Sequence, residues 1–202
     1  MLSDPKVGKL NKKQKEYLNE VREGSFRMTK LVGALLNATR LDLGTYKIEP
    51  EPIELKTLFT DLEKQYSPTI KDKRLTFKIK LPAKLKTVTT DQTIIRLIFD
   101  NLISNAVKYS RPKGNITVSV TDFGVQKFKV SVTDRGYGIP KNQQKEIFTK
   151  MFRADNIASL DTTGTGLGLY MVKAIISSLG GTITFKSKLN QGSTFTVTLQ
   201  RK

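Results

Sequence analysis

A glycine-rich stretch that runs directly into an apolar helix is the feature that most constrains this chain. Residues 161–169 read DTTGTGLGL, in which Gly164, Gly166 and Gly168 alternate with small or apolar residues. Apolar side chains then recur at helical spacing until a Gly-Gly pair predicts the helix end. A glycine-rich turn that opens a helix leaves backbone N–H groups unpaired at the positive end of the helix dipole, which suits phosphate. The pattern indicates a phosphate-binding turn, and a mobile loop before a core helix is the alternative.

The composition narrows the chemistry further. The 202 residues include no cysteine and no histidine, which excludes disulfides, thiolate metal sites and phosphohistidine on this chain. No apolar run is long enough to predict a membrane span. The net charge of +17 is compatible with a nucleic-acid or acidic-lipid surface. Because the lysines are spread along the chain, a solvated surface is the favoured interpretation, and no nucleic-acid partner is expected.

A long helix is predicted over residues 11–41, where apolar residues recur at steps of three and four. About thirty helical residues span roughly 45 Å, which is too long for a packed element of a small domain. A coiled-coil or bundle arm is therefore favoured over a lone surface helix. The apolar stripe predicts self-association; its residues are Val21, Met28, Leu31 and Leu35.

Two prolines in the segment Glu49-Pro-Glu-Pro52 predict an extended linker, because each disfavours helix at the residue before it. We expect a helical region over residues 1–45, a linker over 46–52 and a second domain over 53–202. Within that domain Asp91 is a predicted helix N-cap. The expected helices are 53–71, 92–109 and 143–148, and the expected strands are 74–81, one near Val88, 115–123, 127–134, 182–188 and 193–200. This order predicts an α+β fold, a two-layer α/β sandwich with helices on one face of the sheet.

Four further motifs stand in order with the glycine-rich turn: DNLISNAVKY at 100–109, DRGYGI at 134–139, IFTKMFR at 147–153 and GSTF at 192–195. Together they resemble the catalytic ATP-binding domain of sensor histidine kinases, in the superfamily that includes type II topoisomerases and mismatch-repair ATPases. The resemblance covers about residues 51–202. It implies a Bergerat-type fold with a mixed sheet, and ATP and Mg²⁺ as cofactors.

Asn101 and Asn105 lie one helical turn apart on a single face, and a carboxamide oxygen is a suitable hard ligand for Mg²⁺. The resemblance implies that Asn105 is the main ligand and that Asn101 assists. Lys108 and Arg153 are expected to neutralise phosphate charge during phosphoryl transfer. Helix-capping amides and ordinary surface charges are the alternatives for these four residues.

Asp134 is expected to accept a hydrogen bond from the exocyclic amine of adenine, and guanine presents an acceptor at that position. Gly136 and Gly138 would let the chain fold close to the base, although an Asp-x-Gly turn is equally typical of an Asx turn. Tyr109 is expected to flank the nucleotide, or else to belong to the core. The resemblance implies further nucleotide contacts from Ile139, Phe148, Thr163, Gly164, Thr165, Gly166, Leu167, Gly168 and Thr194. The polar segment 153–163 is predicted to be a nucleotide lid, with an ordinary surface loop as the alternative.

The ATPase relatives usually have a glutamate at the position occupied here by Asn101, which cannot act as a base near neutral pH. We therefore expect slow hydrolysis and transfer of phosphate to a protein histidine that this chain lacks. Residues 14–41 resemble the second helix of the dimerisation and phosphotransfer hairpin, without the helix that bears the histidine. The expected partners are such a histidine-bearing dimerisation helix supplied in trans, a response regulator receiver domain, and a second copy in a full-length homodimer. The expected location is the cytoplasmic portion of a membrane-anchored sensor. A nucleotide-gated interaction module without kinase turnover is the alternative.

Overall fold

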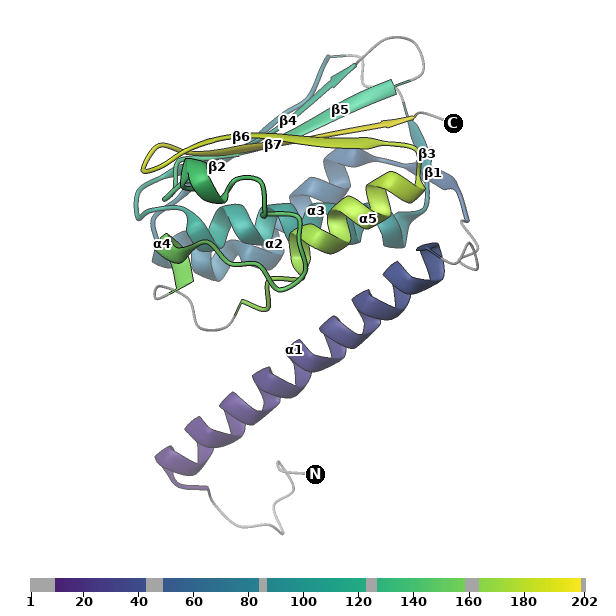
Figure 1. The fold of residues 1–202 in the computed structure, drawn as a ribbon. Coiled ribbons are helices and arrows are strands. Elements are labelled where there is room, and N and C mark those ends of the chain that lie inside the picture. Colours follow the sequence, from purple (N-terminus) through teal and green to yellow (C-terminus); the bar gives the residue numbers. More distant parts are fainter. Residues whose placement is uncertain (1–9, 43–48, 84–86, 123–126, 159–163, 201–202) are drawn as a thin grey trace.

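Helices and strands segregate into layers in the computed structural model, which describes residues 10–42, 49–83, 87–122, 127–158 and 164–200 (Figure 1). The helices are α1 (Lys12–Asp42), α2 (Leu55–Asp72), α3 (Gln92–Tyr109), α4 (Asp155–Ala158) and α5 (Gly168–Ser178), with a 3₁₀ turn η2 (Lys141–Gln143). The strands are β1 (Glu51–Ile53), β2 (Thr76–Lys80), β3 (Val88–Thr90), β4 (Asn115–Asp122), β5 (Lys127–Asp134), β6 (Thr182–Lys188) and β7 (Gly192–Gln200).

The main sheet has five strands in the order β2-β4-β5-β7-β6. Strands β2 and β4 are parallel, and the other three pairs are antiparallel, so the predicted mixed sheet is confirmed. Buried residues alternate with less buried ones along β5 and β7, as expected for strands with one face in the core. The helices α2, α3 and α5 cover that one face (Figure 1).

The core lies between these three helices and the inner face of the sheet. Leu58, Phe59 and Leu62 from α2 pack with the apolar side of α3, where the Phe59 and Phe99 rings meet edge to face at 5.1 Å. Val172 and Ile175 of α5 complete the layer and are fully buried. The predicted two-layer sandwich is therefore confirmed.

One local prediction is wrong. The helix expected over 143–148 is instead the 3₁₀ turn η2 followed by turns, because this backbone closes bonds over three residues, such as Glu146 N–H to the Gln143 carbonyl at 3.1 Å. The side chain of Gln144 also ties the segment to the carbonyls of Ile139 and Ser187. Glu51 and Pro52, at the end of the expected extended linker, are extended and belong to β1, which pairs with β3. The division of the chain into domains stays a prediction.

The N-terminal helix α1 spans 31 residues and continues through Gly24 and Ser25. It lies on the helix side of the domain and contacts α5 (Figure 1). Val21 and Met28 of the predicted stripe are both 65% exposed, whereas the side chains of Leu31 and Leu35 lie outside what the structure describes. Tyr17, Val32 and Leu36 are further exposed apolar side chains on this helix.

Asp91 fixes the start of α3 and confirms the predicted N-cap. Its Oδ1 accepts the Ile94 N–H at 3.0 Å, and its Oδ2 accepts the Glu49 N–H at 3.1 Å. The side chain is only 5% exposed, so both hydrogen bonds form away from bulk water. One carboxylate thus caps the helix and attaches the incoming chain to it.

We expect Asp91→Ala to lower the free energy of unfolding by about 2 kcal/mol, because it leaves two N–H groups without their acceptor. Asp91→Asn keeps one acceptor oxygen and should lose less. Urea denaturation followed by circular dichroism measures both. The exposed Asp72→Ala is the matched control, and an equal loss in Asp91→Ala and this control would contradict the capping role.

Candidate functional site

A cavity of about 410 Å³ lies between α3, α5, the ends of β5 and β7, and the chain between β5 and α5. It opens beside the polar edge of α3, where Asn101, Asn105, Lys108 and Tyr109 all line it. These four residues come from successive turns of one helix whose opposite side is buried in the core. The structure therefore brings the predicted α3 residues together on one wall.

The orientation of Asn101 is set by the helix itself. Its Nδ2 donates to the Leu97 carbonyl at 2.8 Å, and this leaves Oδ1 facing Gly168 at the start of α5. A Cβ at Gly168 would lie 2.8 Å from that oxygen, so the glycine permits the close approach. Asn105 also lines the cavity, and its carboxamide makes no hydrogen bond with the described residues. Both side chains thus have an oxygen available to a ligand on the cavity side.

Lys73 holds the end of α3 that carries Lys108 and Tyr109. Its Nζ donates to the carbonyls of Val107, Lys108 and Ser110, which would otherwise be unsatisfied at the helix C-terminus. A cation at this end also complements the helix dipole. The Lys108 ammonium lies 5.5 Å from the centre of the Tyr109 ring.

Asp134 at the end of β5 is 8% exposed and lines the other wall of the cavity. Its Oδ1 accepts the N–H groups of Gly136 at 2.8 Å and Ser193 at 3.3 Å. Burial raises the pKa of the Asp134 carboxyl to about 6, and the two backbone hydrogen bonds only partly oppose that rise. Its Oδ2 accepts no hydrogen bond from the described residues, so one buried acceptor remains available.

Glycines hold the backbone close around Asp134. A Cβ at Gly136 would lie 2.1 Å from the Tyr109 carbonyl oxygen, and Gly136 bridges to Ser110 at the end of α3. Gly138 has a φ of +64°, and a Cβ there would lie 2.0 Å from the Lys188 carbonyl oxygen. These contacts join the strand end to both α3 and β6 and leave no room for other residues.

The glycine-rich turn closes the cavity opposite α3. Gly164, Thr165, Gly166 and Gly168 line it, and Gly166 has a φ of +70°. The N-cap residue of α5, Leu167, provides no side-chain hydrogen bond to the first turn of the helix. The first N–H groups of α5 are therefore available to an anion at the positive end of the helix dipole.

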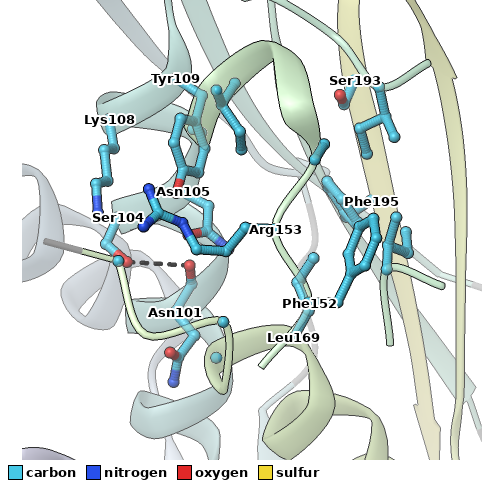
Figure 2. A pocket seen from close by; sticks show the side chains of 18 of the residues that line it. Asn101, Ser104, Asn105, Lys108, Tyr109, Phe152, Arg153, Leu169, Ser193 and Phe195 are labelled. Carbon is cyan, nitrogen blue, oxygen red and sulfur yellow. Dashed lines mark hydrogen bonds between the residues drawn. The ribbon is translucent and has the colours of Figure 1, made fainter. Parts of the chain in front are cut away.

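The rest of the cavity lining has a polar side and an apolar side. Figure 2 shows Arg153 reaching toward Asn105 and Tyr109, while Phe152, Leu169 and Phe195 form an apolar side. Asp100 also lines the cavity, but its Oδ1 accepts hydrogen bonds from Tyr66 and Gln65, both at 2.8 Å. Burial and the nearby Asp100 carboxylate raise the pKa of Tyr66 well above its ordinary value, so this hydroxyl stays a donor. Asp100 thus joins α2 to α3.

Four predicted contacts do not line the cavity. Thr194 faces the opposite side of the sheet, where its hydroxyl pairs with that of Thr133 at 3.1 Å, because successive strand residues point to opposite faces. Gly136 packs behind Asp134, Phe148 stacks edge to face with Phe185, and Leu167 precedes α5. Ile139 lines the cavity, and its contact with a nucleotide stays a prediction, while Thr163 lies outside the described residues.

Ser193 is a site residue that the sequence interpretation missed. It lines the cavity where Thr194 was expected, and its N–H reaches Asp134. The alternation of β7, in which Phe195 and Val197 are buried, places Ser193 on the inner face and could have identified it. Phe195, Phe152 and Ile147 were missed as well, since apolar residues in motifs are not distinguishable from core residues before the cavity is seen.

The predicted lid begins as ordered chain. Arg153 lines the cavity, and α4 follows, with the Asn156 side chain donating to the Gly138 carbonyl at 2.9 Å and the Asp155 N–H donating to Gln143 at 3.1 Å. The first half of the lid segment is therefore attached to the cavity wall. Residues 159–163 lie outside the described part of the chain.

This cavity combines a buried carboxylate oxygen that can accept a hydrogen bond from an amine, an apolar wall, and unpaired backbone N–H groups at a helix N-terminus. The combination is typical of α/β sandwich domains that bind nucleotides between the sheet and the helices. Comparison with known families agrees with that class. The chain belongs to the family of histidine kinase-, DNA gyrase B- and HSP90-like ATPases, whose family model matches residues 90–202. The resemblance to histidine kinase catalytic domains is thereby confirmed.

Individual relatives point the same way. The adaptive-response sensory kinase SasA of Synechocystis sp. is 33% identical over 91% of this chain, which spans 48% of that protein. The fold resembles full-length ShkA in complex with AMPPNP (24% identity, TM-score 0.78, 96% of this chain and 40% of that one). It also resembles ThkA in complex with the response regulator TrrA (21% identity, TM-score 0.70, 98% of this chain and 54% of that one). At these identities the two structures support the fold.

Two glycines with the same backbone conformation test the close packing at the cavity. Gly138 and Gly180 have φ of +64° and +66°, but a Cβ at Gly180 would meet nothing within 4 Å. We expect Gly180→Ala to lower the free energy of unfolding by about 1 kcal/mol, from backbone strain alone. Gly138→Ala should lower it by at least about 2 kcal/mol more, because the new Cβ would also clash with the Lys188 carbonyl oxygen. Denaturant unfolding compares the pair, and equal losses would contradict the close approach.

The raised pKa of Asp134 predicts a pH-dependent loss of stability. The folded value of about 6 exceeds the ordinary 3.8, so the folded chain binds the extra proton and the wild type loses stability as pH rises through this window. Asp134→Asn lacks this titration. We expect the difference in unfolding free energy, variant minus wild type, to increase by about 2 kcal/mol between pH 4 and pH 7 without nucleotide. Asp72→Asn is the control, and a difference independent of pH would contradict the burial effect.

Proposed function

We propose that this chain is the ATP-binding kinase module of a two-component sensor histidine kinase, which transfers the γ-phosphate of ATP to a histidine on another polypeptide segment. The single observation that supports it best is the buried Asp134 carboxylate, whose Oδ2 is an available acceptor at the apolar end of the cavity. Adenine presents its amine to such an oxygen, whereas guanine would present a second acceptor. The base therefore binds beside Asp134, with Phe152, Leu169 and Phe195 at the apolar wall.

The triphosphate then extends toward the polar wall. The first amides of α5 and the glycine-rich turn bind phosphate oxygens, and Lys108 and Arg153 neutralise charge. Asn105, assisted by Asn101, is the proposed Mg²⁺ site, since carboxamide oxygens suit this ion and phosphates and water supply the remaining ligands. No cluster of three acidic residues among the described residues offers another metal site. Bound Mg²⁺ would supply charge neutralisation of the phosphates.

The acceptor must come from outside this chain, since the chain contains no histidine. Asn101 lies where the ATPase relatives use a base and has no carboxylate to activate water, which favours transfer to a protein over hydrolysis. A response regulator receiver domain is the proposed final acceptor, in keeping with the complex described for ThkA. In the full-length protein, α1 would form part of a dimerisation hairpin, and its exposed Val21 and Met28 would pack against a partner helix. The proposed setting is the cytoplasmic portion of a membrane-anchored sensor; among the described residues, no helix combines the length and apolarity that a membrane span requires.

A nucleotide-gated interaction module is the second candidate, favoured by the exposed apolar side chains of α1. In that case ATP would order the cavity and α1 would bind a partner without phosphate transfer. The two candidates share the nucleotide site and differ only in turnover.

Base selectivity is the first test of the site. The N–H groups of Gly136 and Ser193 would bind the amide oxygen in Asp134→Asn and turn its NH₂ toward the base. We expect wild type to bind AMPPNP with Mg²⁺ more tightly than GMPPNP, and the variant to reduce that preference at least tenfold. Calorimetric titration measures both. Asn105→Ala should remove the gain from Mg²⁺ without changing base preference. Asp72→Asn is the control, and unchanged selectivity in Asp134→Asn would contradict the assignment.

Phosphotransfer separates the two candidate functions. The chain is incubated with γ-labelled ATP and a purified histidine-bearing dimerisation hairpin. Acid-labile phosphate on the hairpin supports the kinase; nucleotide-dependent hairpin binding with no transfer supports the interaction module. Phosphoaspartate accumulating on this chain would contradict the proposed direction of transfer.

A further inference from the structure

The outer face of the sheet, defined as the face turned away from α2, α3 and α5, is not covered by any described helix (Figure 1). Strand alternation sends every second residue of the five strands to this face. The outward positions carry lysine, threonine, serine, asparagine and glutamine, together with Gly192 at the start of β7, and none of them in these strands is acidic or aromatic. Its six lysines are Lys78, Lys80, Lys127, Lys129, Lys186 and Lys188.

The strand register arranges these residues in rows. One row across all five strands reads Lys78, Thr117, Thr133, Thr194 and Lys186, with a lysine at each edge and hydroxyls between. Both lysines are exposed, whereas the threonines are half-buried. The short side chains in the middle of the row leave the two edge lysines as its longest side chains. The result is a cationic row that spans the width of the sheet.

A shallow hollow of about 340 Å³ lies at one end of this outer face. Arg135, Lys186 and Lys188 surround it, and Thr133 and Thr194 form part of its floor. Three exposed cations around two hydroxyls form a site of the right chemistry for a phosphate group. Asp134 and Ser193 also line the hollow, and both line the nucleotide cavity as well, so the two sites adjoin at the end of β5. The Asp134 side chain is 8% exposed, and its Oδ1 is held by two backbone N–H groups, so the exposed charges around the hollow are the three cations.

The shape and composition of the outer face favour a planar anionic partner. Sequence-tolerant nucleic-acid platforms use aromatic side chains for stacking, and none points outward from these strands. A bilayer surface extends over the whole width of the sheet and can therefore meet lysines at both edges at once. Lysines near an anionic leaflet each add favourable binding energy, and bilayer contact requires no groove.

We propose that the outer face docks on an anionic phospholipid bilayer, with the hollow between Arg135, Lys186 and Lys188 receiving a headgroup phosphate. The face has no outward apolar residue to insert, so the attachment is electrostatic and reversible by salt. Because the helices lie on the other face, a docked domain keeps the nucleotide cavity and α1 accessible (Figure 1). The proposal does not depend on nucleotide binding or on phosphate transfer.

Vesicle cosedimentation of the full 202-residue chain tests the proposal. We expect binding to phosphatidylcholine vesicles that contain about a quarter phosphatidylglycerol, no binding to phosphatidylcholine alone, and release at about 0.5 M salt. The triple variant Lys78→Gln, Lys186→Gln and Lys188→Gln should lower the partition coefficient about 100-fold, since each lysine at such a surface contributes roughly a fivefold factor. The single variants Lys78→Gln and Lys186→Gln should each lower it about fivefold.

The matched control removes the same charge elsewhere, through Lys12→Gln, Lys56→Gln and Lys71→Gln on exposed positions of α1 and α2. We expect this control to bind within about threefold of wild type, and all variants to keep the wild-type unfolding midpoint. No binding by wild type, or equal losses in the two triple variants, would overturn the proposal. Duplex DNA binding that is lost in the outer-face variant, without vesicle binding, would overturn it in favour of a nucleic-acid partner.

Discussion

Burial of one side of α3 against the sheet is the constraint on which the rest of the site depends. Ile95, Ile98 and Phe99 are fully buried, so the helix cannot rotate without exposing them. Its polar edge is thereby fixed toward the cavity, with the two asparagines one turn apart. The Asp91 cap and the three carbonyls bound by Lys73 fix the two ends of the same helix. The position of the two carboxamides is a consequence of core packing.

The cavity wall that carries Asp134 depends on backbone segments that pack closer together than they could if these glycines had side chains. Gly136, Gly138 and Gly192 let β5, β6 and the end of α3 meet around Asp134, and a Cβ at Gly192 would lie 2.2 Å from the Asp134 carbonyl oxygen. This packing excludes water from the carboxylate and raises its pKa. The same two N–H groups that hold Oδ1 leave Oδ2 without a hydrogen bond from the described residues. The selectivity for adenine that we propose would therefore depend on how tightly these backbone segments pack around Asp134.

The main sheet separates two surfaces of different chemistry. Its inner face, with Phe195 and Ser193, belongs to the core and the nucleotide cavity, while its outer face presents lysines and hydroxyls. In the sequence the lysines are scattered, so the large net charge indicates only a diffuse solvated surface. Strand register collects residues as distant as Lys78 and Lys186 into one row. A patch of this kind is visible only once neighbouring strands are known.

Elements with a strong local signal could be predicted from the amino-acid sequence. Periodicity predicted α3 at about its observed bounds, and the Asp91 cap lies three residues before the N–H it binds. Glycine spacing predicted the turn before α5. The motif order identified the family. Tertiary structure decided what depends on neighbours in space. The segment after Pro140 forms turns in place of the expected helix, and the Gln144 side chain there binds the distant Ser187 carbonyl. Ser193, and not Thr194, lines the cavity, because the pairing of β7 with β5 sets which residue faces inward. Local propensity carries no information about these contacts, since Gln144 and Ser187, like Ser193 and Asp134, lie more than forty residues apart in the chain.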